Sequence, residues 1–343
     1  MDARLERRLR LFAIIVVASV VASVAFSFAR GYASLTGMAV GVSYGLLLTV
    51  PIAGISLFAL SGPMRAWLGG FSFVADLMVR SAIFAAIILP TLFFQLGHVI
   101  AGVPVDPAHK GLWITIAFSV VCVILANLVA GIANIIGPRA LLNFVTGRYH
   151  APIEENRFVL FVDIAGSTGL AERLGGVGIH RLLDRTFRLL TLAVVDYRGE
   201  VLDYVGDDVI VTWRHARGAI DCRPLRCFMA MRDELARASD QLEREFGVVP
   251  RIRGALHFGP VIIGEIGDVK RAIVFNGDVM NTAARLEELS RNVDGGFLAS
   301  RAAMERFDSA PPFALRDLGR LPIRGRVDGI DVVGIDAATP VGS

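Results

Sequence analysis

Long apolar runs occupy the first part of the chain and then stop. A helix needs roughly 20 apolar residues to cross a bilayer, and four stretches approach that length, at residues 11–29, 36–60, 81–96 and 112–136. Beyond residue 150, apolar residues recur at the short spacings of strands and amphipathic helices. The pattern predicts an all-α transmembrane bundle of about four helices over 1–136, followed by a separate globular domain over 157–343.

Flanking charges predict the orientation of these spans. Four arginines lie within the first ten residues, and Arg65 and Arg80 lie between the second and third runs. Because basic residues stay on the inner side, we expect a multi-pass protein of the cell inner membrane with its N-terminus and globular domain in the cytoplasm. The alternative is a cleaved signal peptide over 1–29, but the run is long for one and no clear cleavage site follows.

The membrane half contains a pattern of small residues and a signal that ends its last helix. Gly37, Gly41 and Gly45 recur every four residues, a spacing that permits close helix contact, although such residues are also simply common in membranes. Asn127 in the fourth run is a candidate for a hydrogen bond between helices. A Gly-Pro pair ends that run, so 137–156 is predicted to be a linker.

The globular half predicts strands and helices in a βαββαβ order with further elements after it. Strands are expected at 157–163, 200–205, 209–214, 250–258, 260–266, 271–275, 296–299, 313–318, 321–324 and 330–335. Helices are expected at 168–197, interrupted near Gly175, and at 217–246, 278–290 and 300–307. This order predicts an α+β fold of the ferredoxin-like type.

The composition of the chain argues against some classes of function. The formal net charge is only +3, and no basic block is interleaved with aromatic residues, so nucleic acid is not an expected partner. The three cysteines lack the spacing of a zinc site or a disulfide framework. The mean hydropathy of +0.58 comes from the first half and implies a lipid bilayer as a partner.

Two acids stand at the ends of predicted strands. Asp163 ends an apolar run, and the small turn of Gly166, Ser167 and Thr168 follows it. Asp207 lies in the next hairpin, and the two strands are neighbours in a ferredoxin-like sheet. Two carboxylates beside a turn able to bind phosphate suit two Mg²⁺ or Mn²⁺ ions that hold a nucleoside triphosphate. The alternative for Asp207 and its neighbour Asp208 is an ordinary turn role.

A third candidate lies on the predicted helix over 278–290. Asn281 and Arg285 are four residues apart and share one helix face. An amide there can orient a ribose oxygen, and a guanidinium can stabilise charge on a phosphate. Taken alone, the segment also fits an amphipathic helix with a solvated arginine.

Four segments in order carry a family resemblance. They are F-V-D-I-A-G-S-T at 161–168, Y-V-G-D-D at 204–208, G-A-L-H-F-G-P-V-I-I-G-E-I-G at 254–267 and G-D-V-M-N-T-A-A-R-L-E at 277–287. Together they resemble the class III nucleotide cyclases, that is, the adenylate and guanylate cyclase catalytic domain. The resemblance covers about residues 155–336.

The resemblance implies roles for these residues. Asp163 and Asp207 match the metal aspartates, which hold two ions per site with the backbone carbonyl of Ile164. Asn281 and Arg285 match the transition-state pair. Gly166, Ser167 and Thr168 match the turn that cradles the triphosphate, and Arg326 matches a phosphate contact.

The implied reaction is attack of the ribose 3′-oxygen of ATP on the α-phosphorus, which gives 3′,5′-cyclic AMP and pyrophosphate. Family members act as homodimers through the catalytic domain, with the metal acids from one subunit and the Asn and Arg from the other.

The sequence departs from the family pattern where the purine is read. Asp203 stands where many adenylate cyclases carry Lys, and Val274 stands where Asp or Thr is usual. Arg253, Lys270 and Arg271 are candidate substitutes. ATP is the expected substrate by family frequency. The alternatives are a guanylate cyclase and a regulatory pseudo-cyclase that binds nucleotide without turnover.

Overall fold

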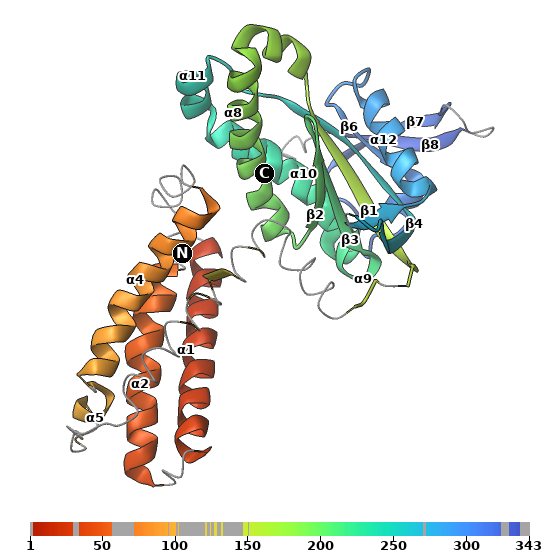
Figure 1. Ribbon diagram of the computed structural model, residues 1–343. Coiled ribbons are helices and arrows are strands. Elements are labelled where there is room, and N and C mark those ends of the chain that lie inside the picture. The colour runs from red at the N-terminus through yellow and green to blue at the C-terminus, as the bar shows by residue number, and fades with distance from the viewer. Residues whose placement is uncertain are drawn as a thin grey trace, which may run out of the picture. The chain divides into compact units, whose positions relative to one another are not determined.

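The computed structural model describes most of the chain, which divides into two compact units, Met1–Thr146 and Gly147–Ser343 (Figure 1). The described residues are 3–29, 34–56, 72–94, 96–100, 147–149, 151–269, 272–323 and 329–336, with the single positions 102, 121, 124, 127, 128 and 132.

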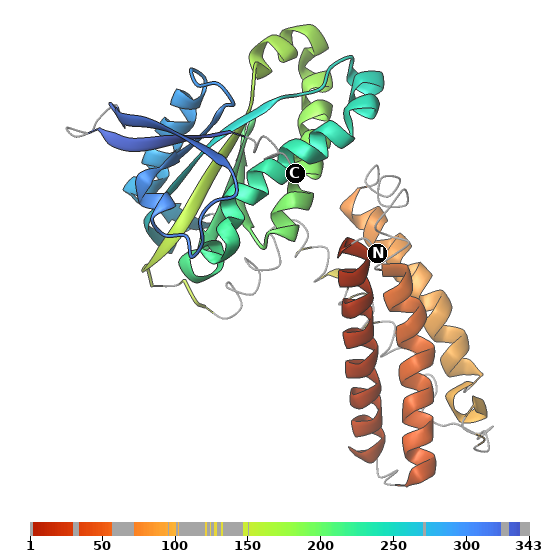
Figure 2. The ribbon, with the colours of Figure 1, turned by 180° about the vertical axis from the view of Figure 1, so that it is seen from behind.

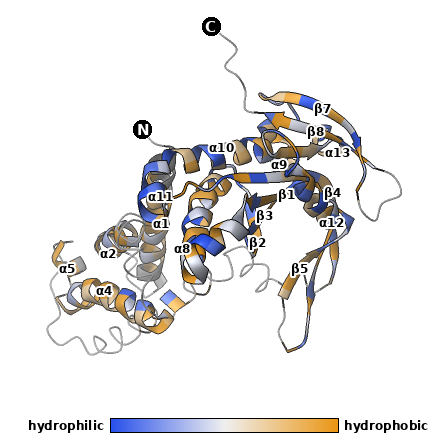
Figure 3. Ribbon diagram, turned by 90° about the horizontal axis from the view of Figure 1, so that it is seen from above, coloured by the Kyte–Doolittle hydropathy of each residue, from blue (hydrophilic) through white to orange (hydrophobic). Residues whose placement is uncertain are grey.

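The first unit is helical where it is described. Its elements are α1 (Ala3–Ala29), α2 (Leu35–Gly54), α4 (Phe73–Phe93) and the short α5 (Leu96–Ile100), and the three long helices lie side by side in both views (Figures 1 and 2). α2 and α4 are long and apolar enough to cross a membrane, whereas the apolar part of α1 is Phe12–Ala25. Seen from above, α4 is largely hydrophobic and α11 of the second unit is largely hydrophilic (Figure 3).

The third predicted run starts too late. α4 begins at Phe73 rather than at residue 81, because Ser72 caps it by accepting a hydrogen bond from the backbone N–H of Ala75 at 3.3 Å. The helix therefore includes Asp76 and Arg80, which form an ion pair at 2.8 Å. Most of the fourth run lies outside the described residues, and its five described positions are helical.

Close packing in this unit follows the small residues. Gly37, Gly41 and Gly45 of α2 are buried, and a Cβ atom on Gly45 would lie 2.9 Å from the Cα atom of Val20 in α1. Asn127 is also buried, and its Nδ2 atom donates to the Ser81 hydroxyl of α4 at 3.4 Å. Both contacts agree with the packing expected from the sequence.

The second unit contains an eight-stranded sheet. Its strands are β1 (Ile153–Ile164), β2 (Glu200–Val205), β3 (Asp208–Arg214), β4 (Ile252–Ile266), β5 (Ala272–Asn276), β6 (Phe297–Ser300), β7 (Ala314–Leu321) and β8 (Ile330–Asp336). The strand order is β2-β3-β1-β4-β6-β8-β7, and β5 pairs with β4. With one helix after β1 and another after β3, the first four strands form the ferredoxin-like unit expected from the sequence.

Helices cover both faces of this sheet. They are α8 (Ser167–Asp196), α9 (His215–Gly218), α10 (Arg223–Arg237), α11 (Ser239–Phe246), α12 (Asp278–Ser290) and α13 (Arg301–Met304), with a 3₁₀ turn at Ile220–Cys222. α10 lies over one face of the sheet (Figure 2), and α8 and α10 pack with Phe158, Leu160 and Val162 of β1 in one core. α12 packs with Val159 and Phe161 on the opposite face.

Three predictions about elements of the second unit are wrong. The single helix expected over 217–246 is interrupted, because Asp221 and Cys222 adopt positive φ and contact a distant loop. The backbone N–H of Asp221 donates to the Asp308 carboxylate at 2.9 Å, and the Cys222 thiol donates to the carbonyl of Ser309 at 3.3 Å.

The second error is the prediction of two strands where the structure has one. β4 continues through Pro260, which lacks the N–H of a strand residue. The strand tolerates it because β6 pairs only with residues 254–256 and β5 only with 262–266, so only β1 pairs with β4 at Pro260. The separate strand expected over 321–324 is also absent in its described part, since Leu321 ends β7 and residues 322–323 have no strand structure.

Candidate active site

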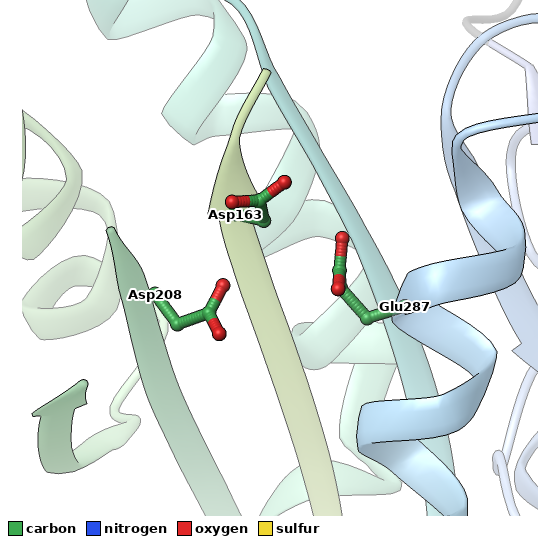
Figure 4. Close-up of side chains that lie close together, drawn as sticks. All are labelled: Asp163, Asp208 and Glu287. Atoms are coloured by element: carbon green, nitrogen blue, oxygen red, sulfur yellow. The ribbon is translucent and has the colours of Figure 1, made fainter. Parts of the chain in front are cut away.

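Three carboxylates meet at the C-terminal end of β1. One carboxylate oxygen from each of Asp163, Asp208 and Glu287 lies within 4.8 Å of the other two. Figure 4 shows Asp208 approaching from β3 and Glu287 from α12, on either side of the strand that carries Asp163. This carboxylate cluster joins three segments that are far apart in the sequence.

Strand alternation accounts for the direction of Asp163. Side chains at every second position of a strand share a face, so Asp163 lies on the same face as Val159 and Phe161, which pack against α12. In the sheet register, Asp163 is opposite Asp208 on β3 and opposite Arg253 on β4. Both neighbours therefore share the face that α12 covers.

Burial and mutual repulsion favour protonation of the cluster. Asp163 and Glu287 are buried. Burial and the negative charges of Asp163 and Asp208 raise the pKa of Glu287 to about 7. Burial and the charges of Asp163 and Asp207 raise the pKa of Asp208 to about 6. Such a cluster gains most from a cation held among its oxygens.

One side-chain cation is already in contact with the cluster. The Arg253 guanidinium forms an ion pair with Asp163, and its Nε atom lies 3.4 Å from Glu287 Oε1. Asp208 is less well satisfied, since its buried Oδ1 atom has no hydrogen-bond partner in the described part of the chain. A buried carboxylate oxygen without a partner is compatible with a hard divalent cation, which prefers oxygen ligands.

Asp207 meets Asp163 as the sequence predicts. The hydroxyl of Ser167 donates to the Asp207 carboxylate, and a side-chain hydrogen bond joins Asp207 to Asp163. Burial raises the pKa of Asp207, but the hydrogen bonds from Ser167 and Asp163 outweigh it and lower that pKa overall. The pKa of Asp163 is raised, by burial first and by its bond to Asp207 second.

Sequence reasoning did not assign Asp208 and Glu287 to the site. The doubled acid at 207–208 is a visible signal, but an ordinary turn also explains it. Glu287 closes the last motif, R-L-E, and its place on the buried face of α12 is the signal that was missed.

The predicted phosphate turn lies directly after the cluster. Gly166 adopts a left-handed conformation with φ of 74° and precedes the first residue of α8, Ser167. A helix N-terminus presents backbone N–H groups that attract anions, and Thr168 beside it is exposed. Ile164 is buried at the end of β1, and the role of its carbonyl as a ligand stays a prediction.

Asn281 and Arg285 lie on the side of α12 away from the cluster. Asn281 is exposed and Arg285 is half-buried, whereas Glu287 is buried. Within the described residues, neither side chain forms a hydrogen bond or ion pair with Asp163 or Asp208. The chain's own contacts therefore do not bring the predicted transition-state pair to its own carboxylates.

The predicted purine readers are dispersed. Asp203 is exposed on β2, and its Oδ1 atom accepts from the backbone N–H of Tyr204 at 2.8 Å. Val274 is half-buried on β5, opposite Gly264. The contacts of Arg253 are with the carboxylates, and Lys270, Arg271 and Arg326 lie outside the described residues.

Comparison with known proteins agrees with this geometry. Residues 150–332 match the family model described as "Adenylate and Guanylate cyclase catalytic domain". The chain is 35% identical over 210 residues to Adenylate cyclase 2 of Rhizobium meliloti, covering 61% of this chain and 57% of the relative. It is 24% identical over 210 residues to Adenylate cyclase of Anabaena cylindrica, covering 60% of this chain and 41% of that relative.

A solved structure shows the same fold. The adenylyl cyclase CyaB from P. aeruginosa superposes with a TM-score of 0.50 at 22% identity, covering 56% of this chain and all of that chain. The chain spans about half the length of the curated relatives it matches. Because the family model covers more than half of its residues, the chain belongs to the family of the adenylate and guanylate cyclase catalytic domain.

Proposed function

We propose that the chain is a membrane-anchored adenylate cyclase that converts ATP to 3′,5′-cyclic AMP and pyrophosphate. The observation that carries the proposal is the meeting of Asp163 and Asp207 beside the turn that opens α8. The named relatives are adenylate cyclases, which favours ATP.

The carboxylates suit Mg²⁺ or Mn²⁺, two ions per site. Asp163 and Asp207 would hold them, with the backbone carbonyl of Ile164 as a further ligand. The unpartnered Oδ1 atom of Asp208 supports a cation at this position. Bound there, the ions would neutralise phosphate charge and lower the pKa of the attacking 3′-hydroxyl.

The remaining roles belong to the chain's own polar groups. The N–H groups around Gly166, Ser167 and Thr168 bind the phosphates, and Arg326 adds a further phosphate contact. Asn281 orients the ribose, so that the 3′-oxygen faces the α-phosphorus. Arg285 stabilises the charge that develops on the phosphate during attack.

A homodimer assembles this site. Asn281 and Arg285 lie on the side of α12 away from their own carboxylates, so they are available to a second copy of the chain. A head-to-tail pair of catalytic domains then has two sites, each with metal acids from one subunit and Asn281 and Arg285 from its partner.

The two apolar helices α2 and α4 support anchoring in a bilayer. We place the chain in the inner membrane with four spans, and with its N-terminus and catalytic domain in the cytoplasm. The arginines in the N-terminal part of α1 support this orientation.

A direct assay tests the activity. The full chain in detergent receives ATP or GTP in separate reactions with Mg²⁺ or Mn²⁺, and cyclic nucleotide is measured by chromatography. We expect cyclic AMP from ATP, and none from the matched variant Asp163→Asn. No cyclic product from either nucleotide would contradict the proposal and favour a regulatory pseudo-cyclase.

A guanylate cyclase is the second candidate, and Asp203 is the observation that favours it. A carboxylate only accepts hydrogen bonds, and guanine presents two adjacent donors, N1–H and the 2-amino group, where adenine presents one amino group beside an acceptor. Cyclic GMP as the main product of the same assay would select this candidate.

A further inference from the structure

The Arg253 side chain contacts two carboxylates that lie on different elements of the fold. It reaches Asp163 across the β1–β4 pair and Glu287 on α12. Its side chain is 19% exposed, against 3% for Asp163 and 6% for Glu287. The guanidinium therefore bridges Asp163, a metal ligand of the proposed function, and Glu287, to which the proposed function gives no role.

The Arg253 guanidinium and a metal ion cannot both be bound at the Asp163 carboxylate. Two positive charges a few ångströms apart repel strongly in a buried site, so a divalent ion at Asp163 must displace the guanidinium. Displacement is easier when a second carboxylate keeps the guanidinium nearby, because a buried arginine without a partner is costly. Glu287 is in position to do this.

We propose that Glu287 is a positioning residue: it holds the Arg253 guanidinium, so that Asp163 can exchange this arginine for a metal ion. The proposal rests on the metal site of the proposed function. Without the Glu287 carboxylate, Arg253 keeps only Asp163 and competes more strongly with the metal.

Direct coordination of the metal by Glu287 is the competing explanation, since its oxygens belong to the carboxylate cluster. The two roles differ in their dependence on Arg253. If Glu287 holds Arg253, its loss weakens metal binding only while Arg253 is present. If Glu287 is itself a metal ligand, its loss weakens metal binding with or without Arg253.

The test is a double-mutant cycle on the full chain in detergent, with Mn²⁺ binding followed by electron paramagnetic resonance without nucleotide. Glu287→Gln should weaken Mn²⁺ binding about tenfold, the usual size for a residue that orients a ligand. Arg253→Gln should tighten it, because Asp163 loses its competitor. In the Arg253→Gln background, Glu287→Gln should have a clearly smaller effect than in the unchanged chain.

Glu288→Gln is the matched control, because Glu288 is the exposed neighbour of Glu287 on α12, and Mn²⁺ binding should be unchanged. An equal loss from Glu287→Gln in both backgrounds would overturn the proposal, and so would no loss in the unchanged chain. If Glu287→Gln fails to fold by circular dichroism, Arg253→Gln decides alone, and unaltered or weaker Mn²⁺ binding would overturn the proposal.

Asp163→Asn separates the failure of the two proposals. It should abolish Mn²⁺ binding at this site. Retained binding would overturn the metal site of the proposed function, and the role of Glu287 with it. Lost binding in Asp163→Asn with an equal effect of Glu287→Gln in both backgrounds would overturn the role of Glu287 alone.

Discussion

At the scale of single residues, the site depends on which face of a strand a side chain occupies. Asp163 is opposite both Asp208 and Arg253 in the sheet register, so the three side chains share one face, and Glu287 joins them there. The sequence predicts the meeting of Asp163 with Asp207. It does not predict the partner of Arg253, because a cross-strand register is not visible in local sequence.

The raised pKa values predict how the stability of the metal-free chain depends on pH. The pKa of Asp208 is raised to about 6 and that of Glu287 to about 7, against about 4 in an unfolded chain. Between these values the folded chain binds more protons than the unfolded chain, so stability falls as the pH rises from about 4 to about 7.

Thermal unfolding checks this dependence. The unfolding temperature of the metal-free chain should fall across that pH window, and Mn²⁺ should restore it at the upper end. Asp208→Asn should flatten the profile, since its amide does not titrate. A rise in unfolding temperature over the same window would contradict the assignment of these protons.

Asp203 carries a prediction about purine choice. Among the described residues, the exposed Asp203 side chain forms a hydrogen bond only with the backbone of Tyr204, so Asp203→Lys should fold normally. Lysine donates where aspartate accepts, so the ratio of cyclic AMP to cyclic GMP formed should rise, by about tenfold for one exchanged charge-assisted hydrogen bond. Asp240→Lys, a charge reversal on exposed α11, is the control, and an identical ratio in both variants would exclude Asp203 from the purine pocket.

At the scale of elements, periodicity predicts most helices and strands of the second unit. The kink of α8 at Gly175 and the bounds of α12 follow from local signals. The interruption of the predicted 217–246 helix does not, because it depends on contacts of Asp221 and Cys222 with residues about 87 positions away. Tertiary contacts of this kind override local propensity.

Gly254 on β4 carries a prediction about close packing. A Cβ atom there would lie 2.5 Å from the carbonyl oxygen of Phe161 and 2.9 Å from the Phe228 ring. Gly254→Ala should therefore lower the free energy of unfolding by about 1–3 kcal/mol, measured by urea denaturation. Gly169→Ala is the control, since a Cβ atom at that helical position meets nothing within 4 Å. Equal stability of the two variants would contradict the packing around β4.

At the scale of the whole molecule, α12 links two roles. Its buried face packs Val279 and Ala283 against β1 and brings Glu287 to the carboxylates. Asn281 and Arg285 lie on the side away from them. One side of α12 thus supports the carboxylates of its own chain, and the other side presents Asn281 and Arg285. This arrangement suits an assembly of two chains better than a single chain.

Complementation tests that assembly. Asp163→Ala and Arg285→Ala should each be inactive alone, because each removes a part that both sites need. Mixed during coexpression, they should recover about a quarter of the normal activity, since half of the dimers are mixed and each has one intact site. Arg285→Ala with Asn281→Ala is the control, because both changes fall on the same side of the site and no recovery is expected. Absence of recovery in the first pair would contradict a shared site.

Local composition and spacing are enough to predict the division into an apolar and a globular part, the family motifs, and the acids at the tip of β1. Tertiary contacts alone bring Asp208 and Glu287 to Asp163 and pair Arg253 with the cluster. Those contacts depend on sheet register and on the packing of α12 against β1. Both arise from residues that are distant along the chain, from 45 positions for Asp163 and Asp208 to 124 positions for Asp163 and Glu287, which no local pattern encodes.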